Sequence, residues 1–162
     1  PSGSEMRSHA HDVADHRVEG TLVCVGYEGR EARELIEHLR ALDVSVVVDV
    51  RLNAISRKRG LSKTALREAL EEAGIDYVHL RALGNPRENR DAYRAGSTAA
   101  RRRFRRRLDS SDGVAAIEHI IGLAVGRIVA VLCFEAEHEA CHRASVIDAV
   151  VERQPRVAAI QA

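Results

Sequence analysis

The chain alternates short β-branched apolar runs with segments whose apolar residues recur at helical spacing, and this alternation constrains the fold most. Four runs are predicted to be buried strands: 21–26, 44–50, 75–80 and 127–133. Helices are predicted over 31–42, 62–74, about 90–108, 113–125 and 144–153. Strands that alternate with helices form parallel sheets, because right-handed crossovers leave few other arrangements. The sequence predicts an α/β fold, a single domain with a mainly parallel sheet of at least four strands and helices on both faces.

Residues 1–19 lie outside this pattern. They are polar and show no periodicity, so we predict a disordered tail or a remnant of expression. Residues 20–162 are predicted to form the single α/β domain. A chain of 162 residues, 45% of them apolar, is long enough for one core and too short for two domains of ordinary size.

Composition excludes several classes of protein. Three cysteines, an odd number, argue against a disulfide framework, and no apolar run approaches the length of a membrane span. We therefore expect a cytoplasmic protein with reduced thiols and no membrane partner. Acidic and basic residues nearly cancel, at 24 against 25, so net charge does not identify a partner. With five aromatic residues, the chain has few parts for a nucleic-acid stacking platform.

Ionisable side chains follow nearly every predicted strand. Ligands of open parallel sheets bind beyond the carboxyl ends of the strands, so we expect these residues to share one edge. The set comprises Tyr27, Asp49, Arg51, Ser56, Arg57, Cys133 and Glu135. Asp49 lies within an apolar strand, where it either holds Arg51 or loop amides in place or acts in the site. Cys24 lies in mid-strand and is predicted to be a small buried hydrophobe.

The segment CFEAEHEACHR, residues 133–143, holds two of the three cysteines. Its length exceeds the two to six residues or so that usually join a strand to a helix, which indicates a binding loop. Cys141, His142 and Arg143 are predicted to begin the last helix, where the helix dipole and the cations would favour a thiolate. Cys141 is therefore expected to ionise below the ordinary thiol pKa of about 8.5. Arg51 and Arg143 are expected to be exposed in the cleft.

Four elements, in order, resemble those of the domain of unknown function family DUF488. They are GYEGR, DVRLNAISRKRGLSK, LGNP and LCFEAEHEACHR, within a resemblance that spans roughly residues 21–152. Ala54, Arg59 and Leu61 depart from residues frequent in the family, in a loop. The resemblance implies a compact α/β fold. It also implies one site made of Tyr27, Asp49, Arg51, Ser56, Arg57, Cys133, Glu135, Cys141, His142 and Arg143.

The residue types leave three functions open, and an enzyme is our leading hypothesis. It would act on an anionic, phosphate-bearing substrate, either a small molecule or a nucleic acid. Arg51, Arg57 and Arg143 would hold the anion. A cysteine would be the nucleophile, with Glu135 or His142 as proton carrier and Asp49 in the same catalytic set.

The two alternatives use other properties of the same residues. In the first, Cys133, Glu135, Cys141 and His142 bind zinc or iron. In the second, the run RRRFRRR, residues 101–107, binds nucleic acid without catalysis. The same run also fits a solvated helix anchored by Phe104 and Leu108. The sequence does not identify the substrate, the cofactor or the oligomeric state.

Overall fold

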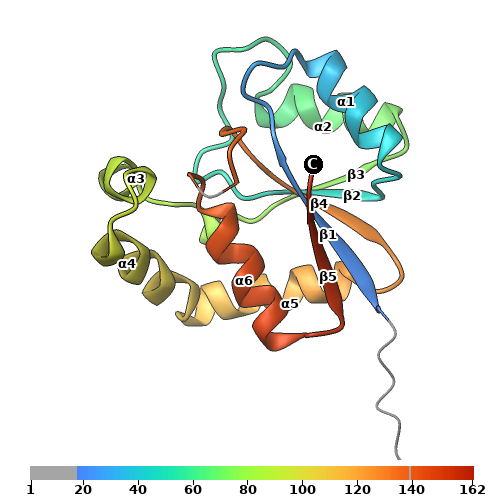
Figure 1. The fold of residues 1–162 in the computed structure, drawn as a ribbon. Helices are drawn as coiled ribbons and strands as arrows, with labels where there is room; N and C mark the ends of the chain where they lie inside the picture. Colours follow the sequence, from blue (N-terminus) through green and yellow to red (C-terminus); the bar gives the residue numbers. More distant parts are fainter. Residues whose placement is uncertain (1–17, 139) are drawn as a thin grey trace, which may run out of the picture.

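The centre of the molecule is a parallel sheet of five strands (Figure 1). The computed structural model describes residues 18–138 and 140–162, so most of the predicted tail lies outside the described residues. The strands are β1 Gly20–Gly26, β2 Val46–Asp49, β3 Asp76–His79, β4 Ile128–Cys133 and β5 Val157–Gln161. Their order is β3-β2-β4-β1-β5, and every pairing is parallel. The predicted α/β class is confirmed.

Strand β5 was not predicted from the sequence. It pairs with β1, beginning at Gly20 and Val157, and forms one edge of the sheet. Only Val157 of its five residues is buried. Its apolar run VAAI, residues 157–160, has four residues, which is shorter than the segments of six or seven residues predicted as strands.

Helices cover both faces of the sheet, as predicted (Figure 1). The first two, α1 Ala32–Ala41 and α2 Lys63–Glu72, lie on one face. The others are α3 Arg87–Arg94, α4 Thr98–Leu108, α5 Ser111–Ala124 and α6 Arg143–Arg153, and their apolar residues belong to the core on the opposite face. A 3-10 turn, η1 Arg81–Leu83, follows β3. None of the described helices has the length and apolar content that a bilayer span requires.

The helical region predicted over about 90–108 is two helices. Gly96 adopts a φ of +84°, a conformation that favours glycine, and it ends the turn after α3. Ser97 then caps α4 by accepting a hydrogen bond from the backbone N–H of Ala100 at 3.2 Å. Phe104 and Leu108 are both buried, as expected of a helix whose arginines surround an apolar anchor.

The sheet separates two apolar cores because consecutive strand residues point to opposite faces. Val47 packs with the leucines of α1 and α2, whereas Val46 and Val48 pack with residues of α4, α5 and α6. The nearly continuous apolar runs of the inner strands follow from burial on both sides.

The connections that follow β1 and β4 leave toward opposite faces of the sheet. The two strands are neighbours, with Gly26 opposite Cys133. Strand β1 leads to α1 on one face, and β4 leads to α6 on the other (Figure 1). Connections that leave adjacent strands toward opposite faces open a crevice at the strand ends, where open α/β sheets bind ligands.

Gly26 is predicted to be essential for this junction. A Cβ there would meet the carbonyl group of Glu135 in the loop after β4. Gly26→Ala should therefore lower the free energy of unfolding by about 1–3 kcal/mol in urea denaturation. Gly122→Ala is the control, because that position in α5 has open space around it and should gain about 0.5–1 kcal/mol. Equal stability of the two variants would contradict this packing.

Candidate functional site

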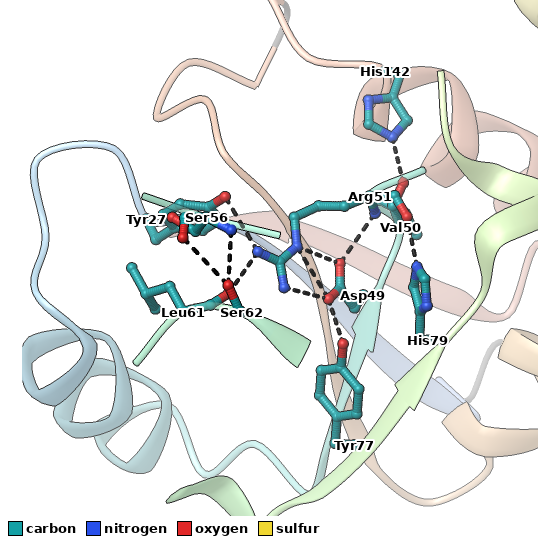
Figure 2. A network of polar contacts seen from close by, with 10 residues as sticks. All are labelled: Tyr27, Asp49, Val50, Arg51, Ser56, Leu61, Ser62, Tyr77, His79 and His142. Atoms are coloured by element: carbon teal, nitrogen blue, oxygen red, sulfur yellow. Dashed lines mark hydrogen bonds and ion pairs between the residues drawn. The ribbon is translucent and has the colours of Figure 1, made fainter. Parts of the chain in front are cut away.

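A buried ion pair between Asp49 and Arg51 lies at the end of β2 (Figure 2). Arg51 Nη2 is 2.7 Å from Asp49 Oδ2, and Arg51 Nε is 2.9 Å and 3.1 Å from the two carboxylate oxygens. Tyr77 donates its hydroxyl hydrogen to Asp49 Oδ2 at 2.5 Å. Asp49 is wholly buried and does not line the cavity described below, which favours the structural one of its two predicted roles.

Burial and the contacts with Asp49 shift the pKa values of Arg51 and Tyr77 from their ordinary values. Burial lowers the pKa of Arg51, but the hydrogen bonds and the charge of Asp49 outweigh it, so the pKa lies above its ordinary value. Burial, followed by the charge of Asp49, raises the pKa of Tyr77. The Arg51 guanidinium therefore remains charged and the Tyr77 phenol remains protonated over the whole physiological range.

Arg51 also holds the loop that follows β2. Its Nη1 donates to the carbonyl oxygen of Leu61 at 2.6 Å and to the hydroxyl of Tyr27 at 3.3 Å (Figure 2). Within the loop, Ser62 Oγ accepts from the backbone N–H of Ser56 at 2.9 Å. Arg51 is only 6% exposed, which corrects the expectation of an exposed cleft arginine whose removal costs little stability.

Three donor atoms from Cys133, Cys141 and His142 converge beside this network, all within 4.8 Å of one another. His142 Nδ1 lies 3.7 Å from Cys133 Sγ and 3.5 Å from Cys141 Sγ. The other ring nitrogen, Nε2, is 2.7 Å from the carbonyl oxygen of Val50 (Figure 2). A carbonyl only accepts, so Nε2 carries the hydrogen, and in the neutral ring Nδ1 presents its lone pair to the two thiols.

Glu135 lies on the other side of Cys133. The thiol donates to Glu135 Oε2 at 3.3 Å, and Arg94 Nη2 donates to Glu135 Oε1 at 3.1 Å. Burial raises the pKa of Glu135, but hydrogen bonds from its own backbone, the two thiols and Arg94 together hold the pKa below its ordinary value. Glu135 is therefore an ionised acceptor at neutral pH and a weaker base than an imidazole.

Cys141 does not behave as its place in the sequence predicts. Helix α6 begins at Arg143 with His142 as its N-cap residue, so Cys141 lies before the cap and is only 1% exposed. Burial raises the pKa of its thiol, and the neighbouring Cys133 raises it further. This corrects the predicted reactive thiolate, because burial of the thiol disfavours its charged form.

Cys24 lies in mid-strand and is buried, as predicted. Its Sγ is 2.7 Å from His138 Nδ1. Burial raises the pKa of the thiol to about 11, although the charge of Arg143 acts in the opposite direction.

Arg143 is wholly buried, which corrects its prediction as an exposed, anion-binding residue. Its Nη2 donates to the carbonyl oxygen of Glu135. Its Nε and Nη1 are buried without a hydrogen-bond partner in the described structure. The guanidinium therefore ties the start of α6 to the loop after β4 from behind the cavity.

A cavity of about 480 Å³ opens at the strand ends. Seven of the ten predicted site residues line it: Tyr27, Arg51, Ser56, Arg57, Cys133, Glu135 and His142. The remaining three, Asp49, Cys141 and Arg143, lie behind its wall. The cavity therefore lies beyond the ends of β1 and β4, where their connections leave toward opposite faces of the sheet. Cys133 and His142 are among its lining residues.

Sequence reasoning missed several lining residues, chiefly Arg90 and Arg94 of α3. These two follow no strand, so a search restricted to strand ends could not find them. Their four-residue spacing, which places both on one side of a helix, was the available signal. Asn85 and Phe134 were also missed as site residues, although both lie within segments already singled out.

Comparison with protein families finds a match over most of the chain. The family model described as "Domain of unknown function DUF488" matches residues 31–150, about three quarters of the sequence. The chain belongs to the DUF488 family. The match includes the Asp49–Arg51 loop and the 133–143 segment, whereas GYEGR precedes it. Searches of curated proteins and of solved structures found no match.

The buried ion pair should dominate the stability of this DUF488 site. Asp49→Ala leaves the Arg51 charge buried and unpaired, so the free energy of unfolding should fall by about 3–5 kcal/mol. Glu37→Ala is the control, because Glu37 pairs with Arg33 on the exposed side of α1 and should cost less than about 1 kcal/mol. Urea denaturation followed by circular dichroism measures both, and similar losses in the two variants would contradict the role of the pair.

The three thiols should differ in reactivity. Cys133 lines the cavity, whereas burial raises the pKa of Cys24 and Cys141. Iodoacetamide at about pH 8 should therefore modify Cys133 first, and the other two only after denaturant is added. Peptide mass spectrometry over time measures the order, and modification of Cys141 at the rate of Cys133 would contradict it.

Proposed function

We propose that this DUF488 protein is an enzyme that acts on an anionic, phosphate-bearing substrate, with Cys133 as its nucleophile. The observation that carries the proposal is the placement of the Cys133 thiol in a cavity with surplus positive charge. His142 is the proton carrier, and the Asp49–Arg51 pair positions the loop that completes the cavity.

The positive charge comes from three side chains. Arg57, Lys58 and Arg90 line the cavity, and none of them pairs with a carboxylate of residues 18–138 or 140–162. Lys58 and Arg90 instead donate to backbone carbonyl oxygens, which positions their charges without neutralising them. The charges of Arg51 and Arg94 are balanced by Asp49 and Glu135. The surplus favours a substrate with more than one negative charge.

His142 is arranged to accept the thiol proton. Its Nε2–H is held by the carbonyl of Val50, so the ring is oriented with the Nδ1 lone pair toward Cys133. A nucleophile, a base and a group that orients the base form the arrangement that activates cysteine in enzymes. Glu135 accepts the thiol hydrogen bond in the resting state, but its lowered pKa makes it the poorer proton acceptor.

The covalent step can be written in full. His142 Nδ1 takes the proton of Cys133, the sulfur bonds to the electrophilic atom of the substrate, and the bond from that atom to the leaving group breaks. The leaving group takes the proton from His142. Water then attacks the same atom, the sulfur leaves, and the water proton returns through His142 to the thiol.

A metal centre is a second candidate, favoured by the convergence of three donor atoms. Cys133, Cys141 and His142 supply two sulfurs and a nitrogen within 4.8 Å of one another, the ligand types that zinc prefers. Cys133 and His142 both face the cavity, so a bound ion would have an open position there. Such an ion would act as a Lewis acid and would make both thiols structural ligands rather than nucleophiles.

Charged alkylating reagents test the proposal. Iodoacetate is anionic and iodoacetamide is neutral, so the ratio of their rates at Cys133 reports the local charge. We expect this ratio to exceed that of free glutathione about tenfold, and to fall when inorganic phosphate is added. The double variant Arg57→Gln/Arg90→Gln should bring the ratio close to the glutathione value. The control, Arg102→Gln/Arg106→Gln, removes the same charge from the exposed side of α4 and should change it little.

Two results would overturn the enzyme. One is a ratio at Cys133 equal to that of glutathione and indifferent to phosphate. The other is purified protein, made without a histidine tag, that holds one equivalent of zinc, resists alkylation at Cys133, and loses the zinc in the Cys141→Ser variant. The second result would establish the metal centre instead.

A further inference from the structure

Two apolar side chains are exposed at the cationic cavity. Phe134 is 41% exposed and Ile55 is 77% exposed, and both line it. Across the described chain only three other large apolar residues are exposed: Val18, Val125 and Ile160. A substrate made only of phosphate would leave this apolar surface in water, so the surface indicates a second, apolar part of the ligand.

The ring of Phe134 is held in place from behind. It meets the ring of Tyr27 edge to face, with the centroids 5.4 Å apart and the planes at 74°. Tyr27 is buried and accepts a hydrogen bond from Arg51, and the carbonyl of Phe134 accepts from the backbone N–H of Glu28 at 2.8 Å. The exposed part of Phe134 is therefore a preorganised surface, on which a flat ring can stack with little loss of side-chain freedom.

The cavity also presents a directed amide. Asn89 Nδ2 donates to the carbonyl of Ala100 and to Asn85 Oδ1, both at 3.0 Å. Asn89 Oδ1 accepts a hydrogen bond from Arg103, which identifies the oxygen and the nitrogen of the Asn89 amide. Because Asn89 Nδ2 donates to Asn85, the atom of Asn85 that it contacts is the amide oxygen. Asn85 lines the cavity with its oxygen already occupied, which leaves Nδ2 to donate to a ligand. A carbonyl or ring nitrogen on the edge of a base is such an acceptor.

We infer that the substrate is a nucleoside phosphate. This inference rests on the proposed function and names the substrate class of the same cavity. The base would stack on Phe134 beside Ile55, Asn85 would contact its edge, and Arg57, Lys58 and Arg90 would hold the phosphate near Cys133. A volume of about 480 Å³ falls in the range of cavities that enclose ligands of this size.

The nucleoside phosphate has two sources, a free nucleotide or a nucleotide within a strand. Arg90 and Arg94 line both the cavity and a neighbouring hollow along α3, which Arg87 extends. Glu88 and Asp91 line the same hollow, and their charges oppose a second phosphate there. A strand would place its next phosphate in this hollow beside Arg87, whereas a free nucleotide has no phosphate to place there. The two sources therefore differ in whether Arg87 contributes to binding.

Calorimetric titration of the full chain tests the inference with adenosine monophosphate and ribose 5-phosphate, which share a sugar phosphate and differ by the base. The base should tighten binding about tenfold in the wild type. Phe134→Ala should abolish the difference and Phe134→Tyr should restore it. Ile160→Ala, an exposed apolar position on β5, is the control that should keep the wild-type preference.

A single-stranded deoxyadenosine dodecamer separates the two sources. Tighter binding of the dodecamer than of the mononucleotide, lost in Arg87→Ala while mononucleotide binding is unchanged, identifies a strand as the source. Equal affinities, unaffected by Arg87→Ala, identify a free nucleotide.

Equal affinity for adenosine monophosphate and ribose 5-phosphate in both the wild type and Phe134→Ala would overturn the inference. If phosphate still slowed iodoacetate at Cys133 in that case, the proposed enzyme would stand with a different substrate. If neither phosphate nor the nucleotide affected Cys133, the proposed function itself would fail.

Discussion

The ion pair between Asp49 and Arg51 is the interaction on which the rest of the site depends. A carboxylate at the end of a strand covered on both sides cannot remain unpaired, and the guanidinium supplies three of the hydrogen bonds that satisfy it. The same guanidinium reaches Leu61 and Tyr27, so one buried charge pair connects β2, the loop after it and the residue that follows β1. The ring of Phe134 rests on that Tyr27. The contacts that satisfy the buried ion pair therefore also position residues that line the cavity.

The sulfur of Cys133 has two polar neighbours. Glu135 Oε2 accepts the hydrogen bond of the thiol at 3.3 Å. His142 Nδ1 lies 3.7 Å from the same sulfur and is the proton acceptor in the function proposed above. The sulfur of the proposed nucleophile therefore lies between a carboxylate that accepts its hydrogen bond and an imidazole nitrogen that can take its proton.

Much of this arrangement could be predicted from the sequence, because its signals are local. Apolar runs and helical spacing identify four of the strands and the covering helices, and residues just past a strand end belong to one edge. What could not be predicted is which side chains at that edge reach solvent. Arg143 and Cys141 carry the types and spacing of a reactive site, yet packing of α6 against the sheet buries both. Arg90 and Arg94 line the cavity from α3, and the position of a helix beside the strand ends is set by tertiary packing rather than by a local signal.

The strand order has a consequence for how the molecule is made. The first strand lies between β4 and β5, which belong to the last third of the chain, whereas β2 finds β3 within thirty-odd residues. During synthesis β1 therefore leaves the ribosome without either of its partners, and the polar N–H and C=O groups along its edges lack strand partners until residue 128 and beyond have emerged. Cys133 and His142 belong to those late segments, so a partial chain that carries both already contains β4, one partner of β1. The other partner, β5, follows, and the two candidate site residues are therefore made shortly before the sheet is complete.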